Sequence, residues 1–264
     1  MNITLPHMPT RTEKPRSSGF TMVMDKGLST RQAEDFIEIS GEYTDVVKLG
    51  FGTSVVSNNV KEKIERYKKA GIKVYLGGTL LEAFIVRNKF EDYLRHIEAL
   101  KLDAAEVSDG SIHLDHDKKC EYIHTLSKHV TVFSEVGSKE EGIIIHPAKW
   151  VKMMKAELDA GSWKVIAEAR ESGTVGIFHS NGRAHGMLIK KITSKIPAES
   201  IIWETPQKSQ QVYFIKQMGV NVNLGNISPD DVIALETLRI GLRGDTFFSY
   251  LPDDIKETHK QTAE

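Results

Sequence analysis

Residues 164–168, Lys-Val-Ile-Ala-Glu, include a short apolar run that ends on a charged residue. Such a run is typical of a parallel strand buried on both faces, because crossover helices cover the outside and packed side chains fill the inside. Seven similar runs occur along the chain, separated by amphipathic, helix-like sequence. We therefore expect eight strands, at residues 20–24, 46–49, 73–76, 104–107, 130–133, 164–167, 201–203 and 221–224.

Eight consecutive strand–helix units without an evident linker predict a single α/β domain, a (β/α)8 or TIM barrel spanning residues 1–264. An open doubly wound sheet shows the same local pattern and stays an alternative. Against it, no strand run is followed by the Gly-x-Gly-x-x-Gly turn of dinucleotide-binding sheets. The polar ends, residues 1–14 and 254–264, are expected to be flexible.

The composition argues against several functional classes. Of 264 residues, 40% are hydrophobic and 27% charged, as in a globular protein with a substantial core. The 35 basic and 36 acidic residues leave a net charge of −1, so no overall field attracts nucleic acid or an anionic membrane. Cys120 is the single cysteine and cannot form an internal disulfide. Without a signal peptide or a membrane-spanning run, the sequence predicts a cytoplasmic protein.

Charged or amide side chains follow nearly every strand run. In a barrel of parallel strands, the loops after the strands converge on one mouth, where active sites form. We therefore expect the site among Asp25, Lys26, Lys48, Glu82, Glu106, Asp109, Glu135, Lys139, Glu168, Arg170, Glu171, Glu204, Lys208, Asn223 and Asn226.

Three glutamates close successive strand runs, namely Glu106, Glu135 and Glu168. Side chains of this kind would meet at the mouth, where uncompensated carboxylates repel one another. A divalent cation would resolve this conflict, and hard oxygen ligands suit Mg²⁺. The alternative is that basic residues of the mouth neutralise the carboxylates without a metal; these residues are Lys48, Lys139 and Arg170.

Three histidines, His113, His116 and His124, follow the fourth strand run. They would suit a transition metal. Because they stand in a polar segment, a solvated loop and helix start explain them equally well.

Taken together, the strand-end motifs point to one known family. They are Lys14–Arg16, Asp25–Gly27, Val47–Gly50, Gly52–Thr53, Gly77–Leu80 with Glu82, Glu106–Gly110, Glu135–Gly137 with Lys139, Glu168–Gly173, Pro206–Gln211, Asn221–Asn226, Leu235–Arg239 and Gly241–Thr246. Because these motifs occur together and in this order, the chain closely resembles the phosphosulfolactate synthase family from Lys14 to about Thr246.

The resemblance implies an enzyme, a carbon–sulfur lyase with a TIM-barrel fold and Mg²⁺ as cofactor. Its reaction would be a Michael-type addition of sulfite to phosphoenolpyruvate, giving (2R)-O-phospho-3-sulfolactate. Mg²⁺ on the substrate carboxylate would act as a Lewis acid while charge develops there, and a general acid would protonate the neighbouring carbon. The pathway that the product enters, towards coenzyme M or another sulfonate, stays open.

The resemblance also implies roles for residues of the mouth. Lys139 is our first candidate for the general acid and Lys48 the second. Glu106, Glu135 and Glu168 would bind the metal, with Asp25 and Glu204 beside them. Contacts to the anionic substrates are expected from Asp25, Lys26, Arg170, Lys208, Arg239 and Arg243, and from backbone amides around Gly225 and Asn226.

Two other functions stay open. One is a related barrel enzyme that acts on another phosphorylated enol or keto acid with the same metal. The other is a non-catalytic, stress-associated relative, because fold similarity alone does not settle function. The resemblance further favours a homo-oligomer.

Overall fold

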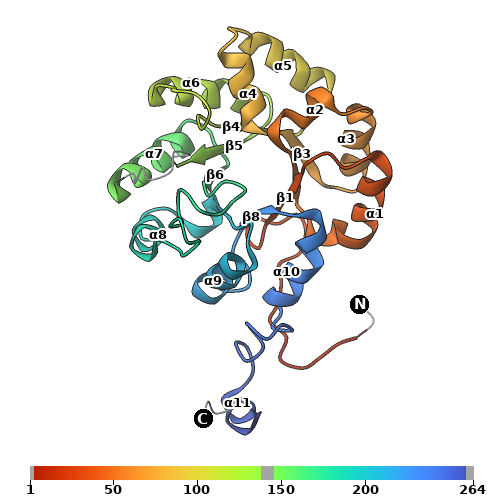
Figure 1. Ribbon diagram of the computed structural model, residues 1–264, viewed down its shortest axis with the longest axis vertical. Helices are drawn as coiled ribbons and strands as arrows, with labels where there is room; N and C mark the ends of the chain where they lie inside the picture. Colours follow the sequence, from red (N-terminus) through yellow and green to blue (C-terminus); the bar gives the residue numbers. More distant parts are fainter. Residues whose placement is uncertain (1–2, 138–145, 260–264) are drawn as a thin grey trace.

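The computed structural model describes residues 3–137 and 146–259. Eight strands occur in these ranges: β1 (Thr21–Asp25), β2 (Val46–Leu49), β3 (Lys73–Leu76), β4 (Ala104–Val107), β5 (Thr131–Val136), β6 (Lys164–Ala167), β7 (Ile201–Glu204) and β8 (Leu224–Ile227). They form one parallel sheet in the order β3-β2-β1-β8-β7-β6-β5-β4. Because β3 and β4 also contact each other, the sheet curls into a barrel, which confirms the predicted fold over the open sheet (Figure 1).

Helices surround the barrel (Figure 1). The described residues contain α1 (Thr30–Ser40), α2 (Thr53–Val56), α3 (Val60–Lys69), α4 (Gly78–Ile85), α5 (Phe90–Ala99), α6 (His116–Ser127), α7 (Pro147–Asp159), α8 (Gly186–Thr193), α9 (Lys208–Met218), α10 (Val232–Arg239) and α11 (Asp253–His259), with 3-10 turns at Gly41–Tyr43, Gly50–Gly52, Ala198–Ser200 and Pro229–Asp231. Local signals explain some boundaries. Ser29 and Gln32 form a capping box at the start of α1, and Pro229 opens the turn that leads into α10.

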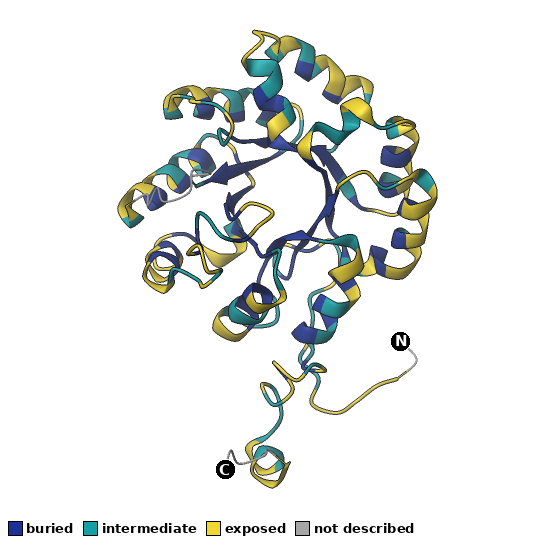
Figure 2. Cartoon of the chain, viewed as in Figure 1, coloured by how far each residue is buried: buried dark blue, intermediate teal, exposed yellow. Residues whose placement is uncertain are grey.

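Burial divides the strand residues into two apolar layers. One set faces outward and packs against the inner sides of the helices, which Figure 2 shows as dark stripes on otherwise exposed helices. The other set fills the barrel interior and consists of Phe20, Met22, Val46, Tyr75, Ala104, Phe133, Ile166 and Ile202. We call these eight residues the interior plug. The polar side chains at the carboxyl ends of the strands lie next to this apolar plug.

The eighth strand begins three residues later than predicted, at Leu224 rather than Asn221. Val222 donates its backbone N–H to Gly219, which places the preceding residues in a turn. The pairing between β1 and β8 then shifts by one residue, because Asn226 adopts a left-handed φ of 55° inside the strand. An alternating apolar pattern alone does not reveal such a bulge.

Both ends of the described chain leave the barrel on the same side (Figure 1). Arg11 is nevertheless tied to the barrel by an ion pair with Glu236 and a hydrogen bond to the Gly19 carbonyl oxygen. Residues 253–259 form α11, which stands apart from the ring of helices. None of the helices in the described ranges has the length and apolar character needed to span a membrane.

Candidate active site

A cavity of about 490 Å³ opens at the carboxyl ends of the strands, and its floor is charged. Side chains alternate along a strand, so a residue two positions after an interior one also faces the interior. Val46 and Ile202 belong to the apolar plug, and Lys48 and Glu204 follow them by two positions. The lining residues are Met24, Lys48, Phe51, Gly77, Thr79, Glu106, Ser111, Glu135, Glu168, Arg170, Glu171, Ser172, Glu204 and Asn226.

Three buried carboxylates meet in this floor. Glu135, Glu168 and Glu204 each present an oxygen within 4.8 Å of the others. Burial, with the neighbouring charge of Glu135, raises the pKa of the Glu204 carboxyl to about 8, while the Ala169 amide donates to its Oε2 at 2.9 Å. Hard oxygen donors in such proximity can hold a divalent cation.

A lysine lies between the carboxylates. Lys48 Nζ is 2.9 Å from Glu106 Oε1 and 3.8 Å from Glu204 Oε1. The Gly78 amide, in the first turn of α4, donates to the same Glu106 oxygen at 2.7 Å. Burial and the Glu106 charge raise the pKa of the Tyr75 hydroxyl below them, which keeps it neutral. The floor therefore combines a cluster of carboxylates that could hold a cation with the buried ammonium group of Lys48.

The rim of the cavity carries polar groups on strained backbone. Arg170 has a left-handed φ of 56°, and its amide donates to Glu168 Oε1 at 2.9 Å. This turn directs its exposed side chain to the rim. Lys26 pairs closely with Glu171 on the same side. Buried Asn226 lines the cavity, and its Oδ1 accepts no hydrogen bond from any described residue.

Glu82 shapes one wall of the site from α4. Its carboxylate is buried and accepts hydrogen bonds from Gly110 N at 2.9 Å, Ser111 N at 2.8 Å and, in a close contact, Ser108 Oγ. It thereby holds the loop after β4, which brings Ser111 to the cavity. The sequence marks Glu82 as a strand-end charge within a family motif, but only the structure reveals this role.

Lys119 supports the same loop from α6. Its fully buried ammonium group lies 2.9 Å from Glu157 Oε1 and 3.1 Å from Asp109 Oδ1. It also donates to the Glu135 carbonyl oxygen at 2.5 Å. This lysine therefore joins the loop after β4 to the end of β5. Nothing in a polar helix sequence distinguishes Lys119 from exposed lysines, so it is absent from the residues predicted for the site.

The predicted catalytic and metal-binding residues fall into three groups. Glu135 and Glu168 stand in the carboxylate cluster, together with Glu204 rather than Glu106. Lys48 lies in the floor and pairs with Glu106. Lys139 lies outside the described residues.

Asp25 does not face the mouth, contrary to its predicted contact with substrate. On the outer side of β1, its Oδ2 lies 2.7 Å from Lys63 Nζ and 3.1 Å from the Tyr67 hydroxyl of α3. Its Oδ1 accepts the backbone N–H groups of Gly27 and Leu28, each at 2.8 Å. The carboxylate is therefore a structural link between the end of β1 and α3.

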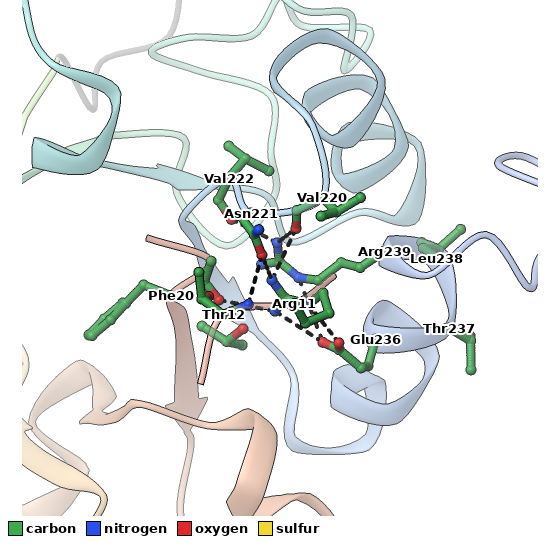
Figure 3. Close-up of polar contacts among 12 residues, drawn as sticks. Arg11, Thr12, Phe20, Val220, Asn221, Val222, Glu236, Thr237, Leu238 and Arg239 are labelled. Carbon is green, nitrogen blue, oxygen red and sulfur yellow. Dashed lines mark hydrogen bonds and ion pairs between the residues drawn. The ribbon is translucent and has the colours of Figure 1, made fainter. Parts of the chain in front are cut away.

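Arg239 lies at the opposite end of the barrel, away from the mouth where we expected it to contact substrate. Because α10 runs antiparallel to the strands, its last residue reaches the amino end of β8. There the buried guanidinium donates to the carbonyl oxygens of Val220 at 2.6 Å and Val222 at 2.7 Å (Figure 3). Burial and nearby Arg11 lower its pKa to about 9, despite the carboxylate of Glu236.

Two further basic residues predicted to bind substrate lie away from the cavity lining. Lys208 starts α9 and forms an ion pair of 2.6 Å with Asp245. Arg243 follows α10, and its carbonyl oxygen accepts the backbone N–H of Thr246 at 2.9 Å. Neither residue lines the cavity.

Gly225 serves the packing of the barrel. A Cβ atom there would lie 2.6 Å from Met22 Cε and 2.8 Å from Ile202 Cγ2, which are plug residues. A larger residue would collide with them, so the glycine is required by the interior. Of the predicted Gly225–Asn226 pair, only Asn226 lines the cavity.

The histidines do not assemble into the alternative metal site. His116 Nε2 lies 3.2 Å from Glu157 Oε1, and His113 is exposed. Among the described residues, the only group of three or more potential ligands in close proximity is the glutamate cluster.

Comparison with known proteins places this site in a family context. The sequence profile of (2R)-phospho-3-sulfolactate synthase (ComA) matches residues 9–245. The phosphosulfolactate synthase of Methanothermobacter thermautotrophicus is 42% identical over 244 residues, covering 90% of this chain and 95% of the relative. That of Bacillus subtilis is 38% identical over 244 residues, covering 91% and 97%. That of Methanocaldococcus jannaschii is 43% identical over 237 residues, covering 87% and 94%.

Solved structures with similar folds are more distant in sequence. The 3-hexulose-6-phosphate synthase of Salmonella typhimurium superposes with a TM-score of 0.56 at 14% identity, covering 85% of this chain and 100% of its own. The 3-keto-L-gulonate-6-phosphate decarboxylase of Vibrio cholerae gives a TM-score of 0.50 at 12% identity, covering 88% and 99%. At these identities the likeness supports the fold alone.

Proposed function

Because this chain belongs to the phosphosulfolactate synthase family, we propose that it forms (2R)-O-phospho-3-sulfolactate from phosphoenolpyruvate and sulfite. In this reaction the sulfur lone pair of sulfite forms a carbon–sulfur bond at the methylene carbon. The carbon–carbon π bond breaks, a proton adds to the neighbouring carbon, and no group leaves. The enzyme must therefore seat two anions, accept charge developing on the carboxylate and deliver one proton.

The observation that carries this proposal is the carboxylate cluster in the floor of the mouth. Three buried oxygens within 4.8 Å of one another, from Glu135, Glu168 and Glu204, suit Mg²⁺, which prefers hard oxygen ligands and leaves positions for substrate oxygens. When bound, Mg²⁺ supplies Lewis-acid stabilisation of charge on the substrate carboxylate. The raised pKa of Glu204 is consistent with a site whose carboxylates require a cation to be ionised together.

The floor and rim contain groups for the remaining tasks. Lys139 is our first candidate for the general acid. Lys48 is the second, and its ammonium group already lies within the cavity lining, 2.9 Å from Glu106. The Arg170 guanidinium at the rim presents a planar fork that suits phosphate or sulfite. Asn226 offers a buried amide beside it.

Product analysis tests the proposal. Purified protein is incubated with phosphoenolpyruvate, sulfite and Mg²⁺, with and without chelator, and phosphosulfolactate is measured by mass spectrometry. We expect product that depends on the metal. Its absence in every sample would overturn the proposed reaction and favour another phosphorylated acid or a non-catalytic role.

Matched variants assign the acid. Lys139→Ala and Lys48→Met are compared with Lys149→Ala, which removes an exposed lysine from α7. Loss of product in one site variant that is shown to be folded and still binds phosphoenolpyruvate, with full activity in Lys149→Ala, would support that lysine as the proton donor. Equal activity in all three variants would remove both lysines from the chemistry while keeping the reaction.

A further inference from the structure

A second cavity lies at the amino ends of the strands, opposite the mouth. Its volume is about 500 Å³. Phe20 and Asp45 directly precede β1 and β2, Lys73 begins β3, and Trp163 directly precedes β6, and all four line it. The mouth, in contrast, is lined by residues at the strands' carboxyl ends. The two cavities are separated by the apolar plug.

Aromatic rings form one wall of this second cavity. Trp163 meets Phe20 edge to face with ring centroids 5.5 Å apart, and Phe133 of the plug with centroids 5.6 Å apart. Trp163 nevertheless keeps 38% of its surface exposed. Since large exposed aromatic surface in a hollow favours an apolar ligand group, this wall suits the body of a small organic molecule.

Basic side chains surround the same hollow. Lys14, Arg16 and Lys73 line it, and Lys164 Nζ lies 4.4 Å from the Trp163 ring centroid. Asp45 is the acidic residue of the lining.

Among the described residues Asp45 pairs with Arg16 and forms no ion pair with Lys14, Lys73 or Lys164, although its charge favours the protonated forms of Lys14 and Lys164. Its Oδ1 is 3.3 Å from Arg16, and its Oδ2 accepts Thr21 N at 2.8 Å. Lys14 and Lys164 donate instead to backbone carbonyl oxygens, those of Gly41 at 2.7 Å and of Ser17 at 2.7 Å.

Within residues 3–137 and 146–259, none of Lys14, Lys73 and Lys164 has a carboxylate within ion-pair distance. Burial lowers the pKa of Lys14, and that of Lys164 to about 8. A bound anion would offset this unfavourable burial of positive charge. An adjoining hollow shares Lys73 and Trp163 and adds Lys128 and His129, together with Asp103, which pairs with Lys68 at 3.0 Å.

We propose that the cavity at the amino end of the barrel binds a small organic anion, with its acidic group against Lys73 and Lys14 and its apolar body against Trp163 and Phe20. The site is distinct from the mouth and does not depend on the reaction proposed there. Aromatic carboxylates match its two halves in chemistry and size.

A titration with benzoate tests this site. The three tryptophan indole N–H signals of the protein are followed by NMR, and Trp163→Phe identifies the signal of Trp163. We expect that signal to shift saturably with a Kd on the order of 1 mM, as small ligands of this size bind. Neutral benzamide, the same size without the charge, should leave it unchanged. Saturating phosphoenolpyruvate should not displace benzoate.

Variants separate this site from general salt effects. Lys73→Ala and, independently, Lys14→Ala should each weaken benzoate binding about five-fold, as expected for one lost charge contact at a partly exposed site. Lys152→Ala removes an exposed lysine from α7 and should change nothing. An indole signal of Trp163 that does not shift up to about 50 mM benzoate would overturn the proposal. So would equal binding of benzamide, or unchanged affinity in both cavity variants.

Discussion

Lys48 Nζ lies 2.9 Å from Glu106 Oε1, and the ion pair is almost fully buried in the floor of the mouth. Lys48→Met would leave the charge of Glu106 without this ion-pair partner and remove the ammonium group that lies 3.8 Å from Glu204 Oε1. We expect a loss of about 3 kcal/mol in the free energy of unfolding, typical of a broken buried pair. Urea unfolding measures it, with exposed Lys152→Met as control. A change within about 0.5 kcal/mol would show that the pair adds no stability.

Glu82 is expected to act on substrate binding through the loop that it holds. In Glu82→Gln one carboxylate oxygen becomes an NH₂ group, which cannot accept a hydrogen bond. Either the Ser111 backbone N–H, or both the Gly110 backbone N–H and the Ser108 hydroxyl, then lose their acceptor. We predict a KM for phosphoenolpyruvate raised about ten-fold, with a smaller change in kcat, because the loop wall shifts. Ser108→Ala, which keeps both backbone contacts, serves as the matched control. Unchanged KM in Glu82→Gln, measured by steady-state kinetics, would remove Glu82 from positioning.

Glu204 should make stability depend on pH. Its pKa is raised from 4.5 to about 8, so between these values the folded protein holds a proton that the unfolded chain has lost. Stability therefore falls as pH rises through this window, and Glu204→Gln should flatten that part of the profile. Thermal unfolding of the metal-free protein at several pH values measures the effect. A profile identical in wild type and Glu204→Gln would contradict the raised pKa.

Because Glu204 holds a proton up to about pH 8, we also expect metal binding to depend on pH. To bind at the proposed cluster, Mg²⁺ would have to displace the Glu204 proton, so its stabilising effect should grow with pH up to about 8. Melting temperatures with and without Mg²⁺ test this. Equal stabilisation across the pH range would place the metal away from Glu204.

Substitution of one arginine should change substrate binding alone, and substitution of another should change stability alone. Arg170→Ala removes an exposed guanidinium from the rim, and we expect KM for phosphoenolpyruvate to rise about ten-fold at unchanged melting temperature. Arg239→Met leaves the Val222 carbonyl oxygen without its side-chain donor and the Val220 carbonyl oxygen with only the longer contact of 3.2 Å from Arg11, and should cost about 2 kcal/mol of stability. Its KM should stay unchanged. Steady-state kinetics and chemical unfolding of both variants give the comparison, and the reverse pattern would contradict the assigned places of the two residues.

The sequence predicts the fold because parallel strands buried on both faces leave a distinctive repeat. It also predicts that strand-end glutamates gather at the mouth, because side chains alternate along strands. Which glutamates meet depends on the register between strands. Ala167 pairs with Trp203, so Glu168 and Glu204, one residue further on, lie side by side. Glu106 pairs with Phe133 and Glu135 pairs with Ile166, so in both cases the next glutamate stands two residues further along its strand, and register of this kind cannot be deduced from one sequence.

Residues on helices were harder to predict than residues at strand ends. Arg239 belongs to one of the family motifs. Because α10 runs antiparallel to the strands, Arg239 lies at the end of the barrel opposite the mouth, where it donates to backbone carbonyl oxygens. Lys119 sits in a polar helix whose sequence resembles an exposed surface, although its side chain is fully buried among acidic partners. In both cases the role depends on which turn of a helix faces which loop, and this information appears only in three dimensions.

We propose that formation of phosphosulfolactate requires the glutamate cluster of the mouth. A ³¹P NMR time course of phosphoenolpyruvate, sulfite and Mg²⁺ tests this with wild-type protein and with Glu135→Gln/Glu168→Gln/Glu204→Gln. We predict that wild type converts the phosphoenolpyruvate signal into that of phosphosulfolactate, while the folded triple variant leaves it unchanged. Equal conversion by both proteins would contradict the proposed site, and no conversion by wild type would contradict the reaction.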